Sequence, residues 1–168
     1  VITTVPLTQL YDAMNIKGTV LDRANALEYR DILFVNYLIK REKYSDAHMV
    51  YLLDTKFNSN RVAEQKNATE RASPSGKTVL TFELPCQRGE KLWTDEADIY
   101  RQTTSDLQKL GISEREIDTQ FILRFLNAYP VFSVGYEHHL GAVKEHLAGF
   151  DNLLVAGRQG LYLNIDMH

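Results

Sequence analysis

Two kinds of periodicity alternate along the chain. Apolar residues three and four positions apart are typical of helices that bury one face, and they recur in four segments. The helices predicted in this way are 7–18, 20–28, 94–111 and 136–147. Segments rich in β-branched and aromatic residues, or with alternating apolar positions, favour strands. The predicted strands are 1–5, 31–40, 48–54, 61–64, 78–84, 117–126 and 152–156.

Several residues mark where these elements should begin and end. Thr8 and Thr94 stand where a side-chain oxygen can cap the first turn of a helix. Pro85 and Pro130 are expected to stop the strands that precede them, because proline lacks a backbone donor. The charged loop 41–46 predicts that the strands on either side of it form an antiparallel pair.

The order of the elements favours the α+β class, with an antiparallel sheet and flanking helices, because strands occur in neighbouring pairs separated by single helices. Both ends of the sequence have the pattern of strands, at 1–5 and 152–156. We therefore expect the chain to be a piece of a larger protein in which these two strands belong to another domain.

Composition and charge exclude several classes of protein. The 168 residues are 44% hydrophobic and carry a formal net charge of -3, which argues against a nucleic-acid partner. Cys86 is the only cysteine, so a disulfide scaffold is excluded and a reducing, cytoplasmic location is expected. Apolar runs stay far below the roughly 20 residues that span a bilayer, which predicts no integral membrane segment.

Neither a metal site nor a nucleophile stands out. His138, His139 and His146 lie on or near one predicted helix without metal-ligand spacing, and we expect them to face solvent. Cys86 lies close to Arg88, which would lower the pKa of a nucleophilic thiol, but a buried or loop thiol is the favoured interpretation. No catalytic residue can be named.

Two polar segments are candidates for ligand binding. Arg61, Lys66 and Asn67 can donate to anionic or carbonyl oxygens, although a solvated loop has the same composition. Gly157-Arg158-Gln159-Gly160 follows a predicted strand and is expected to form a turn. Its glycines let the backbone approach a ligand while Arg158 points a charged fork at phosphate or carboxylate, but a tight turn with a surface arginine fits equally well. Neither G-x-G-x-x-G nor G-x-x-x-x-G-K-[ST] occurs.

Five short motifs occur in one order along the chain. They are Val1-Ile2-Thr3-Thr4-Val5-Pro6-Leu7; Arg61-Val62 with Glu64, Lys66 and Asn67; Lys77-Thr78-Val79-Leu80-Thr81 with Glu83, Pro85 and Cys86; Asn127-Ala128-Tyr129-Pro130-Val131 with Gly135-Tyr136; and Asn152-Leu153 leading to Gly157-Arg158-Gln159-Gly160, Asn164 and Asp166-Met167-His168. Together they resemble the C-terminal half of FAD-dependent oxidoreductases of the flavin amine oxidase superfamily, related to UDP-galactopyranose mutase and protoporphyrinogen oxidase.

This resemblance implies a division into domains. Residues 1–6 would be a strand of a Rossmann-like FAD-binding domain, 7–151 a substrate-binding domain, and 152–168 the returning strand and Gly-Arg turn of the FAD domain. The dinucleotide fingerprint would lie upstream. The fragment alone would then be inactive and would not retain FAD.

The resemblance also assigns roles to residues. Those placed beside FAD are Gly157, Arg158, Gly160, Asp166 and Met167. Those expected to bind a small-molecule substrate are Arg61, Lys66, Asn67, Tyr129, Tyr136, Arg158 and Tyr162.

Three functions remain open at this point. One is a mutase acting on a nucleotide sugar, although the mutase pattern continues after Tyr162 with Arg and Tyr where this chain has Leu163 and Asn164. Another is hydride transfer from substrate to flavin, as in protoporphyrinogen oxidases, amine oxidases or desaturases. The third is a stand-alone ligand-binding or interaction domain without catalysis.

Overall fold

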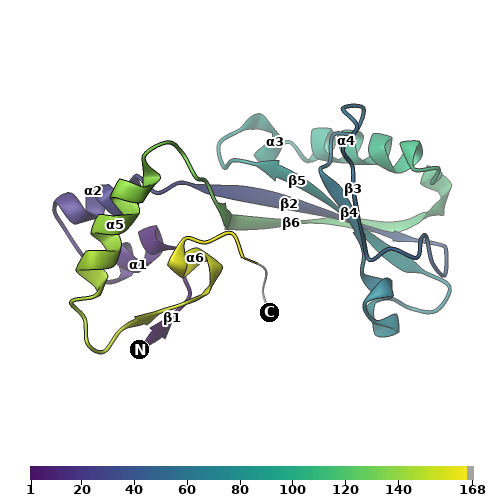
Figure 1. The fold of residues 1–168 in the computed structure, drawn as a ribbon. Helices are drawn as coiled ribbons and strands as arrows, with labels where there is room; N and C mark the ends of the chain where they lie inside the picture. The colour runs from purple at the N-terminus through teal and green to yellow at the C-terminus, as the bar shows by residue number, and fades with distance from the viewer. Residues whose placement is uncertain (166–168) are drawn as a thin grey trace. The chain divides into compact units, whose positions relative to one another are not determined.

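Strand β2 (Tyr29–Ile39) lies inside a five-stranded sheet whose order is β3–β4–β5–β2–β6 (Figure 1). The other strands are β3 (Met49–Tyr51), β4 (Arg61–Glu64), β5 (Thr78–Cys86) and β6 (Ile117–Pro130). The computed structural model describes residues 1–165. Its contacts divide the chain into two compact units, one of residues 31–125 and the other of residues 1–30 with those from 126 onward. The predicted α+β class with an antiparallel sheet is confirmed.

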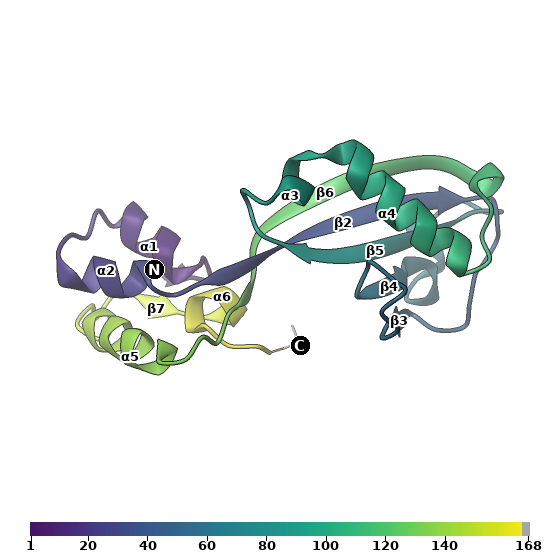
Figure 2. The same ribbon diagram turned by 90° about the horizontal axis from the view of Figure 1, so that it is seen from above.

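In the unit of residues 31–125, side chains alternate between the two faces of the sheet, and helix α4 (Glu96–Lys109) covers one of them (Figure 2). The buried residues on the covered face are Leu33, Val35, Tyr37 and Ile39 of β2, Leu80, Phe82 and Leu84 of β5, and Ile99 and Leu107 of α4. Burying such a side chain contributes about 1.5–3 kcal/mol relative to leaving it exposed. The Tyr37 hydroxyl lies 2.6 Å from Thr103 Oγ1, so its polar end is also satisfied. The sheet and α4 therefore share one core.

The predicted pairing of the strands at 31–40 and 48–54 is wrong. Strand β2 pairs instead with β5, in a register that runs from Asp31 opposite Cys86 to Ile39 opposite Thr78. This pairing aligns the apolar residues of both strands under α4, whereas β3 has only three residues and pairs with β4 at the edge. The free energy gained by burying the matching apolar faces is thus larger than the loop-closure entropy that a local hairpin would save.

The two prolines that were expected to end strands lie at or next to the strand ends. Pro85 lies within β5 opposite Ile32, and Pro130 is the last residue of β6. Each stands within one residue of its strand's end, where the missing N–H removes little from the ladder.

The predicted N-caps are also wrong. Helix α1 (Leu7–Ala13) begins after Pro6, and Thr8 is inside it. Thr94 ends the short helix α3 (Lys91–Thr94), while the Asp95 carboxylate caps α4 by accepting from the N–H of Asp98 at 3.0 Å. The carboxylate is the better cap because its charge also suits the positive end of the helix.

The other unit contains the helices near both ends of the chain and a second, smaller sheet. Its further elements are β1 (Ile2–Thr3), α2 (Thr19–Asn25), α5 (Tyr136–Leu147), β7 (Leu154–Val155) and α6 (Gly157–Leu161). Strands β1 and β7 pair in parallel, with Ile2 opposite Leu154. The helices pack around a separate core that includes Leu7, Tyr11, Ala24 and Val143.

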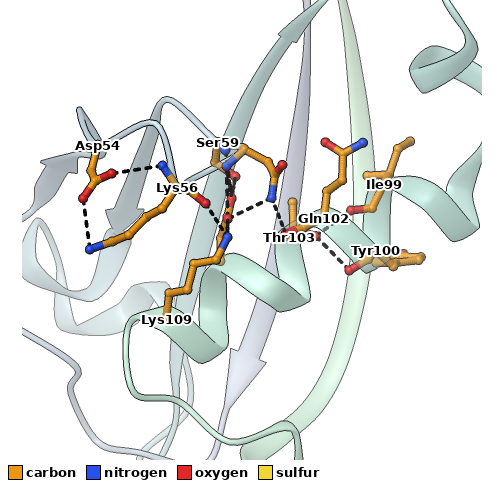
Figure 3. A network of polar contacts seen from close by, with 10 residues as sticks. Asp54, Lys56, Ser59, Ile99, Tyr100, Gln102, Thr103 and Lys109 are labelled. Atoms are coloured by element: carbon orange, nitrogen blue, oxygen red, sulfur yellow. Dashed lines mark hydrogen bonds and ion pairs between the residues drawn. The ribbon is translucent and has the colours of Figure 1, made fainter.

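Two buried carboxylates fasten the loops of the 31–125 unit. Asp106 of α4 is fully buried and accepts from the N–H and hydroxyl of Ser59, both at 2.8 Å, from the N–H of Asn58, and from Lys109 (Figure 3). The second is Glu64, which is 2% exposed. It accepts from the N–H groups of Tyr44 and Ser45 and from the hydroxyl of Thr78. The long polar connections, which include the 3₁₀ turns Gln65–Asn67, Glu70–Ala72 and Glu114–Glu116, therefore have fixed points of attachment.

Three observations concern residues 1–165 as a whole. No helix among them is long and apolar enough to cross a membrane. No group of three or more His, Cys, Asp or Glu side chains is gathered there as a metal would require. Cys86 is 1% exposed at the end of β5 and forms no disulfide, so the interpretation as a buried thiol is confirmed.

We expect Asp106→Asn to lower the free energy of unfolding by about 2–3 kcal/mol, because an amide nitrogen would face the buried donors of Asn58 and Ser59. Urea denaturation measures this loss. The control is Asp54→Asn, since Asp54 is an exposed carboxylate that accepts from the N–H of Lys56. Equal effects of the two substitutions would contradict the role given to Asp106.

Candidate functional site

The segment Gly157–Gly160, expected as a turn, forms the first part of helix α6. Ala156, in an extended conformation, is the one residue between β7 and α6, and Tyr162 ends the helix with a φ of 55°. The expected turn is therefore wrong in form, although the prediction that a strand leads directly to Arg158 is correct. A short helix satisfies more of the backbone groups at this junction than an open turn would.

Both glycines of this segment are packed against the chain itself. Gly157 has a φ of +75°, and a Cβ there would lie 3.2 Å from the Cβ of Thr4. A Cβ at Gly160 would lie 3.0 Å from Val155 Cγ1 and 3.6 Å from the carbonyl oxygen of Thr3. The close approach that these glycines permit is thus an approach of α6 to β1 and β7. Their role beside a cofactor stays a prediction.

Arg158 is held in a defined position. Its guanidinium lies over the ring of Tyr129, 4.8 Å from the centroid, and its Nε donates to the carbonyl of Ile165 at 2.6 Å. Arginine binds carboxylates and phosphates through the N–H groups in the plane of its guanidinium, which stacking on an aromatic face does not occupy. The structure therefore brings together two of the predicted binding residues, Tyr129 and Arg158.

Tyr162 lies in an aromatic cluster behind α6. It is 1% exposed, and its hydroxyl donates to the carbonyl of Val131 at 2.7 Å and lies 2.8 Å from that of Glu28. Its ring contacts those of Tyr29 and Tyr136, with centroids 5.2 and 5.7 Å away. Burial raises the pKa of Tyr162. Tyr162 thus stabilises the fold, and a substrate reaches its ring only if the cluster opens.

Tyr29 connects three parts of the same unit. Its hydroxyl accepts from the N–H of Leu7 at 3.1 Å and donates to the carbonyl of Gln159 at 2.9 Å, joining the first turn of α1 to α6. Burial raises the pKa of Tyr29 to about 12. The position of Arg158 depends on this neutral hydroxyl, since Gln159 is the next residue in the helix.

The three predicted residues of the 31–125 unit are engaged with that unit. Arg61 pairs with Glu83 at 2.6 Å. The Lys66 ammonium pairs with Glu42 and donates to the carbonyl of Lys77 at 3.0 Å. The Asn67 amide donates to the carbonyls of Ser45 and Ala47 at 2.9 and 2.7 Å. Lys66 and Asn67 also line a polar groove of about 580 Å³, so a ligand role for them is compatible with their structural one.

The sequence analysis missed the sheet face opposite α4. A row of side chains crosses this face from Tyr51 through Arg61 and Glu83 to Phe34, whose ring meets that of Phe125 at 5.2 Å. Beside this row lies a groove of about 340 Å³. It is lined by Phe34, Asn36, Gln65, Ala72, Val79, Thr81, Phe121 and Leu123. One signal was available, because 121–126 has large apolar residues at odd and even positions alike, which predicts a strand that is apolar on both faces.

Other predicted residues have mixed outcomes. Asp166 and Met167 lie outside the described residues. His138 is exposed, as expected, but His146 is half-buried with its Nδ1 3.1 Å from the Tyr11 hydroxyl. The expectation that all three histidines face solvent is therefore wrong for His139, whose Nδ1 lies 3.4 Å from Arg23 Nη1, and for His146, because α5 turns it toward α1.

No protein-family model matches the sequence, and no curated protein matches it. Solved structures do match, and they share the fold of this chain. The reduced UDP-galactopyranose mutase structure aligns with a TM-score of 0.79 and 17% identity over 95% of this chain and 35% of that one. A putative protoporphyrinogen oxidase from Exiguobacterium sp. 255-15 aligns with a TM-score of 0.68 and 16% identity over 95% of this chain and 36% of that one. A putrescine oxidase double mutant aligns with a TM-score of 0.54 and 12% identity over 84% of this chain and 33% of that one.

This chain therefore spans about a third of the length of the proteins that it matches. At these identities the likeness establishes the fold. The resemblance inferred from the ordered motifs is confirmed at that level.

We expect Gly160→Ala to destabilise the protein by about 1–3 kcal/mol, since the new methyl group would be pressed against Val155. The matched control is Gly141→Ala in α5, where a Cβ meets nothing within 4 Å and the better helix former should add about 0.5–1 kcal/mol. Thermal and urea unfolding measure both. The packing argument fails if both variants are stabilised.

We expect the free energy of unfolding to fall as the pH rises from about 10 to about 12. Unfolded tyrosines ionise near pH 10, whereas folded Tyr29 and Tyr11 keep their protons up to about 12, so the unfolded state loses protons first in this window. Urea titrations at successive pH values test this slope. Tyr29→Phe should make it shallower, while the same change at Tyr51, which is 62% exposed, should not. An unchanged slope in Tyr29→Phe would refute the assignment.

Proposed function

We propose that this chain is the part of a FAD-dependent oxidoreductase that supplies the substrate-binding domain and part of the flavin site. The observation that carries the proposal is the fold likeness over 95% of the chain to UDP-galactopyranose mutase and to a putative protoporphyrinogen oxidase. At 95% of the chain, that likeness extends beyond the unit that holds most of the five-stranded sheet, residues 31–125. A likeness limited to a common sheet architecture would carry far less weight.

The proposal assigns residues 1–6 and 152–168 to the FAD-binding domain and 7–151 to the substrate domain. The parallel pairing of β1 with β7 supports it, because every pairing with a defined register in the larger sheet is antiparallel. Parallel strands occur mostly in α/β domains with both faces covered, the architecture of dinucleotide-binding folds.

Arg158 is the residue best suited to FAD among those described. Its guanidinium is fixed by Tyr129 and by the carbonyl of Ile165, so it can donate to a carbonyl or phosphate oxygen without first becoming ordered. Gly157 and Gly160 would offer only their backbones, since β1 and β7 occupy the space beside their Cα atoms. Asp166 and Met167 complete the proposed set. When bound, FAD supplies the redox chemistry.

The substrate in this proposal is a small molecule. A mutase would bind a nucleotide sugar with Arg158 and the polar side chains of Arg61, Lys66, Asn67, Tyr129, Tyr136 and Tyr162. An oxidase or desaturase would instead orient a substrate for hydride transfer to flavin. The open apolar groove on the five-stranded sheet favours this second reaction. We also propose a cytoplasmic location, which the presence of only one cysteine in the 168-residue sequence supports.

Purification of the protein encoded by the whole gene tests the proposal. We expect flavin absorption bands that survive gel filtration, and a G-x-G-x-x-G upstream of Val1 with an acidic residue about 20 positions later. A start codon directly before Val1, or no flavin bands after FAD is supplied, would refute it.

In that protein, Arg158→Ala should weaken binding of FAD or substrate by about 10- to 100-fold, the range for one charge-assisted hydrogen bond. Flavin content by absorbance and titration with FAD measure the effect, and thermal unfolding checks that the variant folds. Arg115→Ala is the matched control, because Arg115 is exposed on the 3₁₀ turn Glu114–Glu116. Unchanged flavin content and turnover in Arg158→Ala would remove Arg158 from the site.

A further inference from the structure

The groove on the uncovered face of the five-stranded sheet has the features of a ligand site. Its volume of about 340 Å³ falls in the range of small-molecule sites, about 300–1,000 Å³. Strands β2, β5 and β6 supply its floor, and Gln65 and Ala72 of the β4–β5 connection supply one wall. Phe121 and Leu123 are each 46% exposed, which is unusual for large apolar residues in the middle of a strand.

The lining of the groove has no net charge. Five of its eight residues are apolar, and the other three are Asn36, Gln65 and Thr81. On the same face of the sheet, Arg61 and Glu83 neutralise each other through an ion pair of 2.6 Å. An anionic ligand would lose its hydration in this groove without gaining a cationic partner.

One polar pair in the floor can orient a ligand. The Thr81 hydroxyl donates to Asn36 Oδ1 at 2.7 Å, and Asn36 Nδ2 donates to the carbonyl of Phe34 at 3.2 Å. A side-chain amide carries two N–H groups, so Asn36 retains one for a ligand's acceptor. Asn36 is only 6% exposed, and its side chain is fixed by both bonds.

We propose that this groove binds the substrate, and that the substrate is a neutral, mainly apolar molecule with a planar ring system and one hydroxyl or carbonyl group. Phe34 and Phe121 line the groove and offer aromatic rings for contact with the ring system, and the remaining N–H of Asn36 can donate to the polar group. The identification of this ligand as the substrate rests on the proposed function. A diphosphate does not suit this groove, because no cationic side chain lines it.

The test uses 2-naphthol and, as a charged analogue on the same rings, naphthalene-2-sulfonate. With the isotope-labelled protein encoded by the whole gene, we expect naphthol to shift the NMR signals of Asn36, Thr81 and Leu123, and the sulfonate to bind about tenfold more weakly or not at all. Leu123→Asp should reduce naphthol affinity about tenfold, the low end for one apolar contact. The control is Leu53→Asp, because Leu53 is 87% exposed and outside the groove.

The outcomes separate this inference from the proposed function. Absence of naphthol binding, equal binding of the sulfonate, or equal loss in both Asp variants would overturn the inference even if the whole protein contains flavin. Binding at the groove in a protein that never takes up FAD would preserve the site and refute the flavoenzyme. If Leu123→Asp fails to fold, Leu123→Ala removes the same contact without a charge and must also weaken binding.

Discussion

The pairing of β2 with β5 is the constraint on which the larger unit depends. Nine residues of each strand lie opposite one another, and this register directs Leu33, Val35 and Tyr37 toward α4. A slip of one position would exchange the two faces of β2. The same register therefore places Phe34 and Asn36 on the face opposite α4. One strand register thus determines both the core and the groove.

The smaller unit depends on hydroxyl groups more than on strand pairing. Strands β1 and β7 share only two pairs of residues, too few to hold a helix in place. Tyr29 and Tyr162 compensate, because their hydroxyls bind backbone carbonyls of Gln159 and Val131 from within a buried aromatic cluster. The helix that carries Arg158 is thus held by neutral tyrosines of the same unit.

The sequence allowed the fold class and most elements to be predicted, since these follow from local periodicity. Arg158 was named from its glycine-flanked motif and Tyr129 from the resemblance of the ordered motifs. Strand partners could not be predicted in the same way, because β2 selects β5 by matching apolar faces across more than forty residues of chain. The groove was missed for a related reason. Asn36, Thr81 and Leu123 are distant in sequence, and only the sheet brings them together. Lys66 and Asn67 are residue types that often bind ligand oxygens. The residue type does not tell whether the oxygen belongs to a ligand or, as here, to the carbonyls of Lys77 and Ala47.

The glycines of α6 have a consequence for how such chains are traced through evolution. Gly157 and Gly160 are required by the junction between α6, β1 and β7, whatever lies beyond it. A descendant that abandoned redox chemistry would still lose stability on replacing either glycine, since a side chain there would press against Thr4 or Val155. A Gly-Arg-Gln-Gly sequence after a terminal strand is therefore evidence of a shared fold. The presence of a cofactor has to be established from residues that the fold does not require.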